Sequence, residues 1–397
     1  MKKFLGILVL GIGIVLTIPD KTFAACDLEL STAATDRYQC DDGDTMTITS
    51  DGSIERLWYD IDPGHESNGG TATTGVTINN AGTIYARESS ESGTGKYAVF
   101  FDGSTNGTLI NSGTISADTQ RAVSAGPVNT TTNFTLTNSG TIQASCWAAP
   151  NKLAGNEQEC TSGTGAQAIH VKGSDATITN ETDGIIKADD NIIVFSASDS
   201  TLTNRGQIIS DDTSGSDEQM AIRVLTGAKR SNIHNYGTIT TGYKTILIDN
   251  SSNDDVTLTN YSGGTITSYY RQSISITSGV DGFTLNNNEG ATIQTTGTND
   301  GYGISMDGTT NTTVVNGGTM SSHINGLRCL TCADVNFTNT GTIENTKTTG
   351  GGAALIIAES TGTNTVTNSG EITSAYTRGL DVSQTTGTTV TNTASGT

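Results

Sequence analysis

The chain has 397 residues, with 40 Asp and Glu against 20 Lys and Arg, and its net charge is −20. Such an acidic surface repels phosphate backbones and anionic lipid headgroups, so we expect no nucleic-acid partner. The four His residues are scattered and no EF-hand loop occurs, so no metal and no cofactor is predicted.

The N-terminus has the features of a secretory signal. Lys2 and Lys3 precede the apolar run Phe4–Ile18, Pro19 ends that run, and Thr22-Phe23-Ala24 offers small residues where a signal peptidase would cut. This order of charged, apolar and small residues is typical of a signal peptide. We therefore predict that residues 1–24 are a signal peptide. The rest would be exported through the periplasm to the cell surface, the outer membrane or the medium.

Six cysteines in an exported chain predict disulfides. Local pairing is the simplest hypothesis, although about fifteen connectivities exist for six cysteines. Cys26 would pair with Cys40 in an N-terminal cap formed by residues 25–43. Cys146 would pair with Cys160 and so bracket an insertion at residues 145–161.

A short phrase recurs through residues 44–397. It reads apolar, polar, apolar, polar, Asn, small, Gly, Thr, Ile, as in "VTINNAGTI" at Val76–Ile84 and "VNFTNTGTI" at Val335–Ile343. Thirteen copies occur, mostly 22 to 31 residues apart. We predict a sharp turn at each, for which Asn and Gly would supply left-handed backbone conformations. The best-preserved pairs are Asn80 and Gly82, Asn111 and Gly113, Asn138 and Gly140, Asn204 and Gly206, Asn235 and Gly237, Asn339 and Gly341, and Asn368 and Gly370.

A second phrase, apolar–x–apolar, alternates with the first, as at Ile169/Val171 and Ile222/Val224. Each unit therefore contains three short strands of period two. A unit of this size cannot bury a core alone, but stacked units can share one. We predict an all-β fold: a right-handed single-stranded parallel β-helix, a three-sheet solenoid of about thirteen coils. Asn side chains of neighbouring coils would stack as an amide ladder.

These phrases carry a family resemblance. The turn "TLTNSGTI" at Thr135–Ile142 and the strands "AIHV" at Ala168–Val171 and "AIRV" at Ala221–Val224 resemble the passenger domains of adhesin-like Gram-negative autotransporters. The resemblance covers about residues 44–397. It implies adhesion or contact at the cell surface, with a glycan or another surface ligand as partner. It also implies transport by outer-membrane machinery through a C-terminal barrel.

The last copy of the phrase stops before its Ile, and no barrel strands are recognisable after Cys332. We therefore expect the chain to be an N-terminal piece of a longer reading frame. On this view, the C-terminal remainder is missing. A third hypothesis follows from it, in which the β-helix is a structural stalk for a missing C-terminal domain.

A different hypothesis is a secreted β-helical polysaccharide lyase or glycoside hydrolase. Such an enzyme needs acids grouped on one outer face. The candidates lie between Gly and Ser in loops, where acids are ordinarily solvated, so we predict no catalytic residue and no enzymatic activity. These candidates are Asp183, Asp189, Asp190, Asp211, Asp212, Asp217 and Glu218, and Asp254, Asp255 and Asp300 continue the tendency more weakly.

Tyrosines form a second candidate site, because exposed aromatic rings can stack on sugars. They recur over neighbouring coils at Tyr236, Tyr243, Tyr261, Tyr269 and Tyr270.

The motif "CLTC" at Cys329–Cys332 resembles a redox pair. Cys329, however, falls on an inward position that Val or Ile fills elsewhere, so we favour a free cysteine packed as a small hydrophobe.

Overall fold

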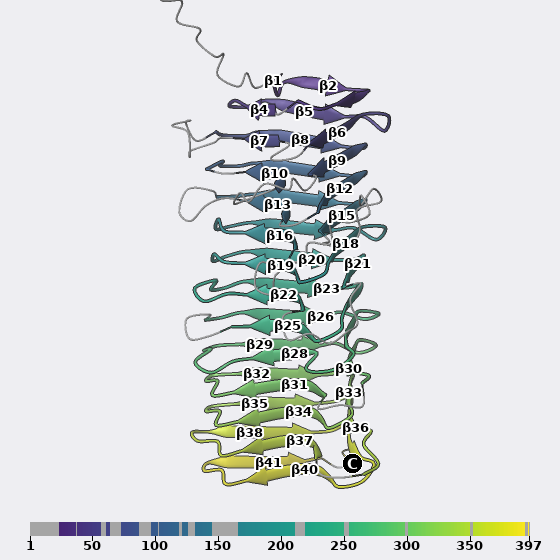
Figure 1. Ribbon diagram of the computed structural model, residues 1–397. Helices are drawn as coiled ribbons and strands as arrows, with labels where there is room; N and C mark the ends of the chain where they lie inside the picture. The colour runs from purple at the N-terminus through teal and green to yellow at the C-terminus, as the bar shows by residue number, and fades with distance from the viewer. Residues whose placement is uncertain are drawn as a thin grey trace, which may run out of the picture.

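The computed structural model describes residues 24–36, 38–56, 61–63, 73–86, 97–101, 103–118, 121–125, 132–144, 166–210, 219–249, 254–297, 301–349, 352–393 and 396. Every element in these ranges is a strand, and every strand pairing is parallel. The strands stack coil on coil into a long rod (Figure 1). The predicted right-handed parallel β-helix with three sheets is confirmed.

Sheets A and B contain fourteen strands each, and sheet C contains thirteen. The chain passes from A to B to C in each coil. Sheet A consists of β1 (Ala24–Ala25), β4 (Tyr38–Cys40), β7 (Ile61–Pro63), β10 (Tyr97–Phe101), β13 (Arg121–Ala125), β16 (Gln167–Val171), β19 (Asn191–Phe195), β22 (Met220–Val224), β25 (Lys244–Ile248), β28 (Ile274–Ile276), β31 (Tyr302–Asp307), β34 (Asn325–Leu330), β37 (Ala353–Ala358) and β40 (Arg378–Ser383).

Sheet B consists of β2 (Leu28–Leu30), β5 (Thr45–Ile48), β8 (Thr77–Asn80), β11 (Thr108–Asn111), β14 (Thr135–Asn138), β17 (Thr177–Asn180), β20 (Thr201–Asn204), β23 (Asn232–Asn235), β26 (Thr257–Asn260), β29 (Thr284–Asn287), β32 (Thr313–Asn316), β35 (Asn336–Asn339), β38 (Asn364–Asn368) and β41 (Thr388–Asn392). Sheet C consists of β3 (Ala33–Ala34), β6 (Ser53–Arg56), β9 (Thr83–Ala86), β12 (Thr114–Ala117), β15 (Thr141–Ala144), β18 (Ile185–Ala188), β21 (Gln207–Ile209), β24 (Thr238–Thr241), β27 (Thr265–Ser268), β30 (Thr292–Thr295), β33 (Thr319–Ser322), β36 (Thr342–Asn345) and β39 (Glu371–Ser374).

One continuous core runs along the rod. Alternate residues of each strand point inward, so that Leu136 is buried while Thr135 on its flank is exposed. Equivalent residues pair in register between coils, which places aliphatic side chains in columns. Each coil therefore covers the apolar side chains of the next, as the repeat pattern requires.

An amide ladder forms where strands of sheet B end. Each ladder asparagine donates a hydrogen bond from Nδ2 to Oδ1 of the next, over 2.7 to 2.9 Å. Oδ1 of Asn80 lacks a donor, because Ile48 occupies the equivalent position of the preceding coil. The ladder comprises Asn80, Asn111, Asn138, Asn180, Asn204, Asn235, Asn260, Asn287, Asn316, Asn339, Asn368 and Asn392.

The glycines of these turns have a role other than the expected one. None of Gly82, Gly113, Gly140, Gly206, Gly237, Gly341 and Gly370 has a positive φ, and neither do the asparagines beside them. A Cβ on Gly140 would instead collide with the carbonyl oxygen of Gly113 in the preceding coil. These seven turns need Gly because adjacent coils approach each other closely there, so the expectation of left-handed backbone was wrong for them, although Gly290 in a looser copy does have a positive φ.

The residues assigned to a cap, 25–43, supply β2, β3 and β4, which are hydrogen-bonded to the next coil in the three sheets. Cys26 and Cys40 are buried and form a disulfide there. Cys146 and Cys160 lie outside the described residues, as does all of the predicted signal peptide except Ala24.

Cys329 and Cys332 also form a disulfide. Cys329 points into the core, in register with Met306, as expected. The expectation that it is a free thiol was wrong, since the chain turns after β34 and brings Cys332 back against it. Both residues are fully buried, which shields the bond from solvent reductants.

Among the described residues, no helix has the length and apolar character needed to cross a membrane.

The ladder can be tested with two neighbouring residues. In Asn287→Ala, Oδ1 of Asn316 loses its donor and Nδ2 of Asn260 loses an acceptor, while both stay buried. We expect the free energy of unfolding in urea to fall by about 1–3 kcal/mol. Asn286→Ala, on the outer side of the same strand, is the control and should change it by less than about 0.5 kcal/mol. Equal effects of the two changes would contradict a stabilising ladder.

Candidate binding face

The outer side of sheet A carries one continuous column of side chains. Each member lies between the two inward residues of its strand and pairs in register with the member of the next coil. We call the surface over this column the A face. The column consists of Phe100, Ser124, His170, Val194, Arg223, Leu247, Ser275, Ser305, Arg328, Ile356 and Asp381.

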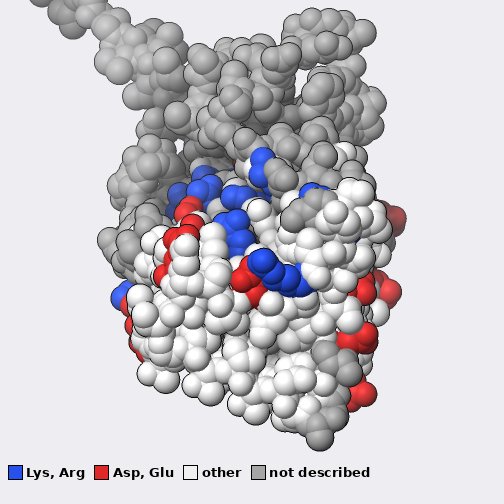
Figure 2. All heavy atoms as spheres, turned by 90° about the horizontal axis from the view of Figure 1, so that it is seen from below, with Lys and Arg blue, Asp and Glu red and all other residues white. Residues whose placement is uncertain are grey.

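The A face is recessed. Ser124 is 0%, Val194 2% and Leu247 5% exposed, although all three point away from the core. Outward residues of sheet B are far more open, with Ile110 44% and Val315 37% exposed. Figure 2 shows the molecule end-on: Lys and Arg side chains extend along a hollow, and Asp and Glu gather mainly at its margins.

Arginine and tyrosine pair across adjacent coils of the A face. The Arg121 guanidinium lies 5.4 Å from the ring centroid of Tyr97 and donates to its hydroxyl over 2.9 Å. Arg328 lies 4.7 Å from the ring centroid of Tyr302 and donates to that hydroxyl over 3.2 Å. Tyr97 itself stacks on Phe100, with 4.5 Å between ring centroids. These contacts hold each guanidinium flat against the face.

The cations of the A face fall into two groups. Arg223 forms an ion pair of 2.8 Å with Asp249, and Arg378 forms one of 2.8 Å with Asp381. Arg121 has no carboxylate partner within the described residues and donates instead to Gln167, over 2.9 Å, and to Tyr97. Arg328 likewise has no carboxylate partner within the described residues, and its guanidinium donates to the Tyr302 hydroxyl. These two guanidiniums keep their full positive charge on the face.

His170 is almost fully buried in the N-terminal half of the face. Its Nε2 lies 2.8 Å from Oγ of Ser196. Burial, and then the positive charges of Arg121 and Lys172, lower the pKa of His170 to about 2. The imidazole is therefore neutral at physiological pH and can only hydrogen-bond. Burial is the main cause, and Arg121 and Lys172 add a positive potential at the imidazole.

Buried polar atoms without a hydrogen-bond partner concentrate here. Oγ of Ser124, Nδ1 of His170, Oδ1 of Asn191 and Nε of both Arg223 and Arg328 all lack one. Such atoms are rare in folded proteins, because each costs about 1–3 kcal/mol unless a water, an ion or a ligand satisfies it. The A face thus presents a row of polar groups that the described part of the chain leaves unsatisfied.

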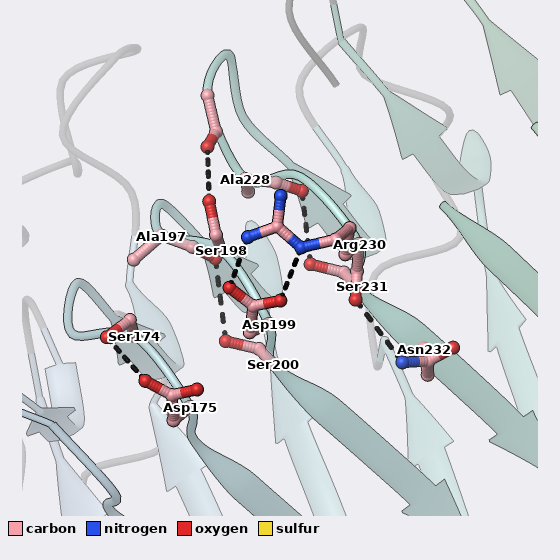
Figure 3. Close-up of polar contacts among 11 residues, drawn as sticks. Ser174, Asp175, Ala197, Ser198, Asp199, Ser200, Ala228, Arg230, Ser231 and Asn232 are labelled. Atoms are coloured by element: carbon pink, nitrogen blue, oxygen red, sulfur yellow. Dashed lines mark hydrogen bonds and ion pairs between the residues drawn. The ribbon is translucent and has the colours of Figure 1, made fainter. Parts of the chain in front are cut away.

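The corner between sheets A and B holds paired charges (Figure 3). Arg230 donates two hydrogen bonds, of 2.7 and 2.6 Å, to the carboxylate of Asp199 in the preceding coil. Lys229 forms an ion pair of 2.6 Å with Asp254. The hydrogen bonds from Arg230 lower the pKa of Asp199. The left-handed conformations expected at the Gly turns occur here instead, for example at Asp175 and Asp199.

The acids considered as candidates for a catalytic site do not lie together where the structure describes them. Asp183 lies in the turn between β17 and β18, while Asp189 and Asp190 lie between β18 and β19, at another corner of the coil. The remaining candidates, Asp211, Asp212, Asp217 and Glu218, lie outside the described residues. In the described part of the chain, no three His, Cys, Asp or Glu side chains are grouped so that they could hold a metal ion.

The tyrosine cluster divides into two parts. Tyr236 and Tyr261 stack at the corner between sheets B and C, with ring centroids 4.0 Å apart and Arg205 over Tyr236. Tyr243 lies at the corner between sheets C and A and is buried beneath Lys244 and Arg271. Tyr269 and Tyr270 follow β27 and lie at the corner between sheets C and A of the next coil. The five rings do not form one platform.

The residues of the A face were missed at the sequence level, apart from the outward orientation expected of His170. The available signal was the middle position of the apolar–x–apolar phrase. It is polar in Ser124, His170, Arg223 and Arg328. An outward position is ordinarily read as solvated surface, and only the fold shows that this one is recessed.

Comparisons with known proteins add little about function. No protein-family model matches the chain, and no curated protein matches its sequence. Among solved structures, it is similar to a tailspike protein mutant of E. coli bacteriophage HK620 in complex with a pentasaccharide. The identity is 10% and the TM-score 0.40, over 93% of this chain and 74% of that one. A likeness of this degree carries no argument about function.

The pKa of His170 predicts a pH dependence. The unfolded histidine has a pKa of about 6.5, so below that pH the unfolded chain binds a proton that the folded chain does not. Stability should therefore fall as the pH drops from 7.5 to 5.5, with about 1 kcal/mol of this loss due to His170. Urea unfolding of His170→Gln should lack that part of the slope.

His234→Gln is the control for this measurement. Partial burial also lowers the pKa of His234, but that residue remains in contact with solvent on sheet B, so its contribution should be smaller. An unchanged slope in His170→Gln would show that the histidine is not buried as described.

Proposed function

We propose that this protein is an exported, autotransporter-type surface protein whose β-helix binds a glycan along the A face and so mediates adhesion or contact between surfaces. The observation that carries the proposal is the column of unpartnered polar atoms in the recess of sheet A, from Ser124 to Arg328. A single extended occupant with many hydrogen-bonding groups would satisfy the whole row at once.

The chemistry of the face favours a sugar chain among polar ligands. Sugars combine hydroxyl groups with apolar ring faces, and the A face offers both kinds of partner. Hydroxyl, imidazole and guanidinium groups occur in the same column as Phe100, Val194, Leu247 and Ile356. A regular column of side chains, one per coil, suits an extended polymer better than a compact ligand.

The proposal is one of binding rather than cleavage. Two carboxylates beside the face, Asp249 and Asp381, are each held in an ion pair by an arginine. Both carboxylates therefore already have a partner within the chain.

Export and display are part of the same proposal. They rest on the predicted signal peptide at residues 1–24 and on the resemblance of the repeats to autotransporter passengers. Transport through the outer membrane by a C-terminal barrel belongs to this proposal as well. The Cys26–Cys40 disulfide is compatible with passage through an oxidising periplasm.

Glycan-array binding of the chain without residues 1–24 tests the proposal. We expect binding to a subset of glycans and at least a tenfold loss in Ser305→Trp, because the bulky indole would project from the column of the A face next to Arg328, with which Ser305 pairs in register. Thr338→Trp, on the outer side of sheet B, is the control and should bind as the wild type does. Circular dichroism confirms the fold of both. An array without any bound glycan would refute the proposal.

A further inference from the structure

Two arginines of the A face lack the carboxylate partner that a buried or half-buried guanidinium ordinarily has. Arg121 and Arg328 contact tyrosine hydroxyls and, for Arg121, a glutamine amide. Nε of Arg328 is buried without any acceptor. Several other described arginines do have acids, since Arg205 has Glu181, Arg223 has Asp249 and Arg230 has Asp199, whereas Arg271 lies over the ring of Tyr243.

This contrast matters in a chain with twice as many acids as bases. Carboxylates are plentiful, yet the described residues place none against these two guanidiniums. Desolvating a guanidinium without a counter-charge is costly, so such a site favours an anion from outside. The guanidinium is also the cation best suited to carboxylate and sulfate groups, because its fork can donate two hydrogen bonds at once.

The surroundings of Arg121 point the same way. His170 is kept neutral by burial and by the positive charges of Arg121 and Lys172. Ser124, in register with His170, has a buried hydroxyl with no partner. A positive potential beside an unsatisfied hydroxyl donor is the arrangement that an anionic group with several acceptor oxygens would fill.

We propose that the A face binds an acidic glycan, whose carboxylate or sulfate groups are held by Arg121 near the N-terminal end of the face and by Arg328 toward its C-terminal end. This inference rests on the proposed glycan binding and specifies the class of sugar. Arg223 is excluded from the anion-binding role because Asp249 already neutralises it. The glycan chain would lie along the rod and cross the coils between the two arginines.

The experiment uses matched pairs of polymers: polygalacturonate with its methyl ester, and dextran sulfate with dextran. In each pair the backbone is the same and the charge differs, and the two acids separate carboxylate from sulfate recognition. We expect at least one acidic polymer to bind at least tenfold more tightly than its neutral partner. Arg121→Gln and Arg328→Gln should each weaken that binding at least tenfold. Arg205→Gln, at the corner between sheets B and C, makes the same change in net charge and should have no effect.

A measurement on the wild-type chain avoids any effect of substitution on folding. Phenylglyoxal modifies accessible arginines, and peptide mass mapping locates the adducts. Bound acidic polymer should protect Arg121 and Arg328 but leave Arg205 as reactive as before. Equal protection of all three would overturn the inference.

The outcomes separate this inference from the proposed function. Equal binding of charged and neutral partners, unaffected by the arginine variants, would refute an acidic ligand but leave glycan binding standing. No binding to these polymers or to any glycan of an array would refute both. Equal protection of the two arginines by single-stranded DNA would show that charge alone is recognised, and would also overturn the acidic-glycan inference.

Discussion

The pairing of each coil with the next at the Asn turn is the constraint on which the rest of the structure depends. There the ladder amides are 2.7 to 2.9 Å apart, and the glycines allow the turns to lie against one another. Some of these turns are longer, for example Glu181–Gly184. The ladder continues there, and the amide of Asn180 also donates to the carbonyl of Gly184. An error of one residue there would turn every inward side chain of the following strand outward. A fixed register is therefore what allows one core to run along the whole rod.

The same constraint decides where variation is tolerated. The corner between sheets B and C stays short, with two to four residues between the strands, and the long connections occur at the other two corners. The connections from β9 to β10 and from β15 to β16, for example, are far longer than the one from β12 to β13. Both variable corners flank sheet A, and the outer side of that sheet is recessed. The rigid part of each coil thus supplies regular columns of side chains, and the chemistry in those columns is free to vary.

The net charge of the chain and the local placement of its charged side chains lead to different expectations. A net charge of −20 predicts repulsion of polyanions, and it is the correct guide for an evenly mixed surface. The fold instead places Arg121 and Arg328 along one sheet with no carboxylate partner among the described residues, while acids such as Asp199 and Asp254 lie at the corner beside it in ion pairs of their own. Within a few ångströms of the A face the nearby guanidiniums outweigh distant acids, since Coulomb interactions fall with distance and are screened by salt.

The sequence by itself determined the fold class, the three strands per coil, the asparagine ladder and the inward position of Cys329, because each is written in a local repeat of fixed period. It gave the wrong reason for the turn glycines, since contact between successive coils is invisible within one coil. It also missed the Cys329–Cys332 bond and the A face. Ser124, His170 and Arg328 come from different coils, and in one dimension each is a polar residue between two apolar ones. Only the stacked structure decided that they share a recess and leave polar atoms unsatisfied, because burial depends on neighbours that are distant in the chain.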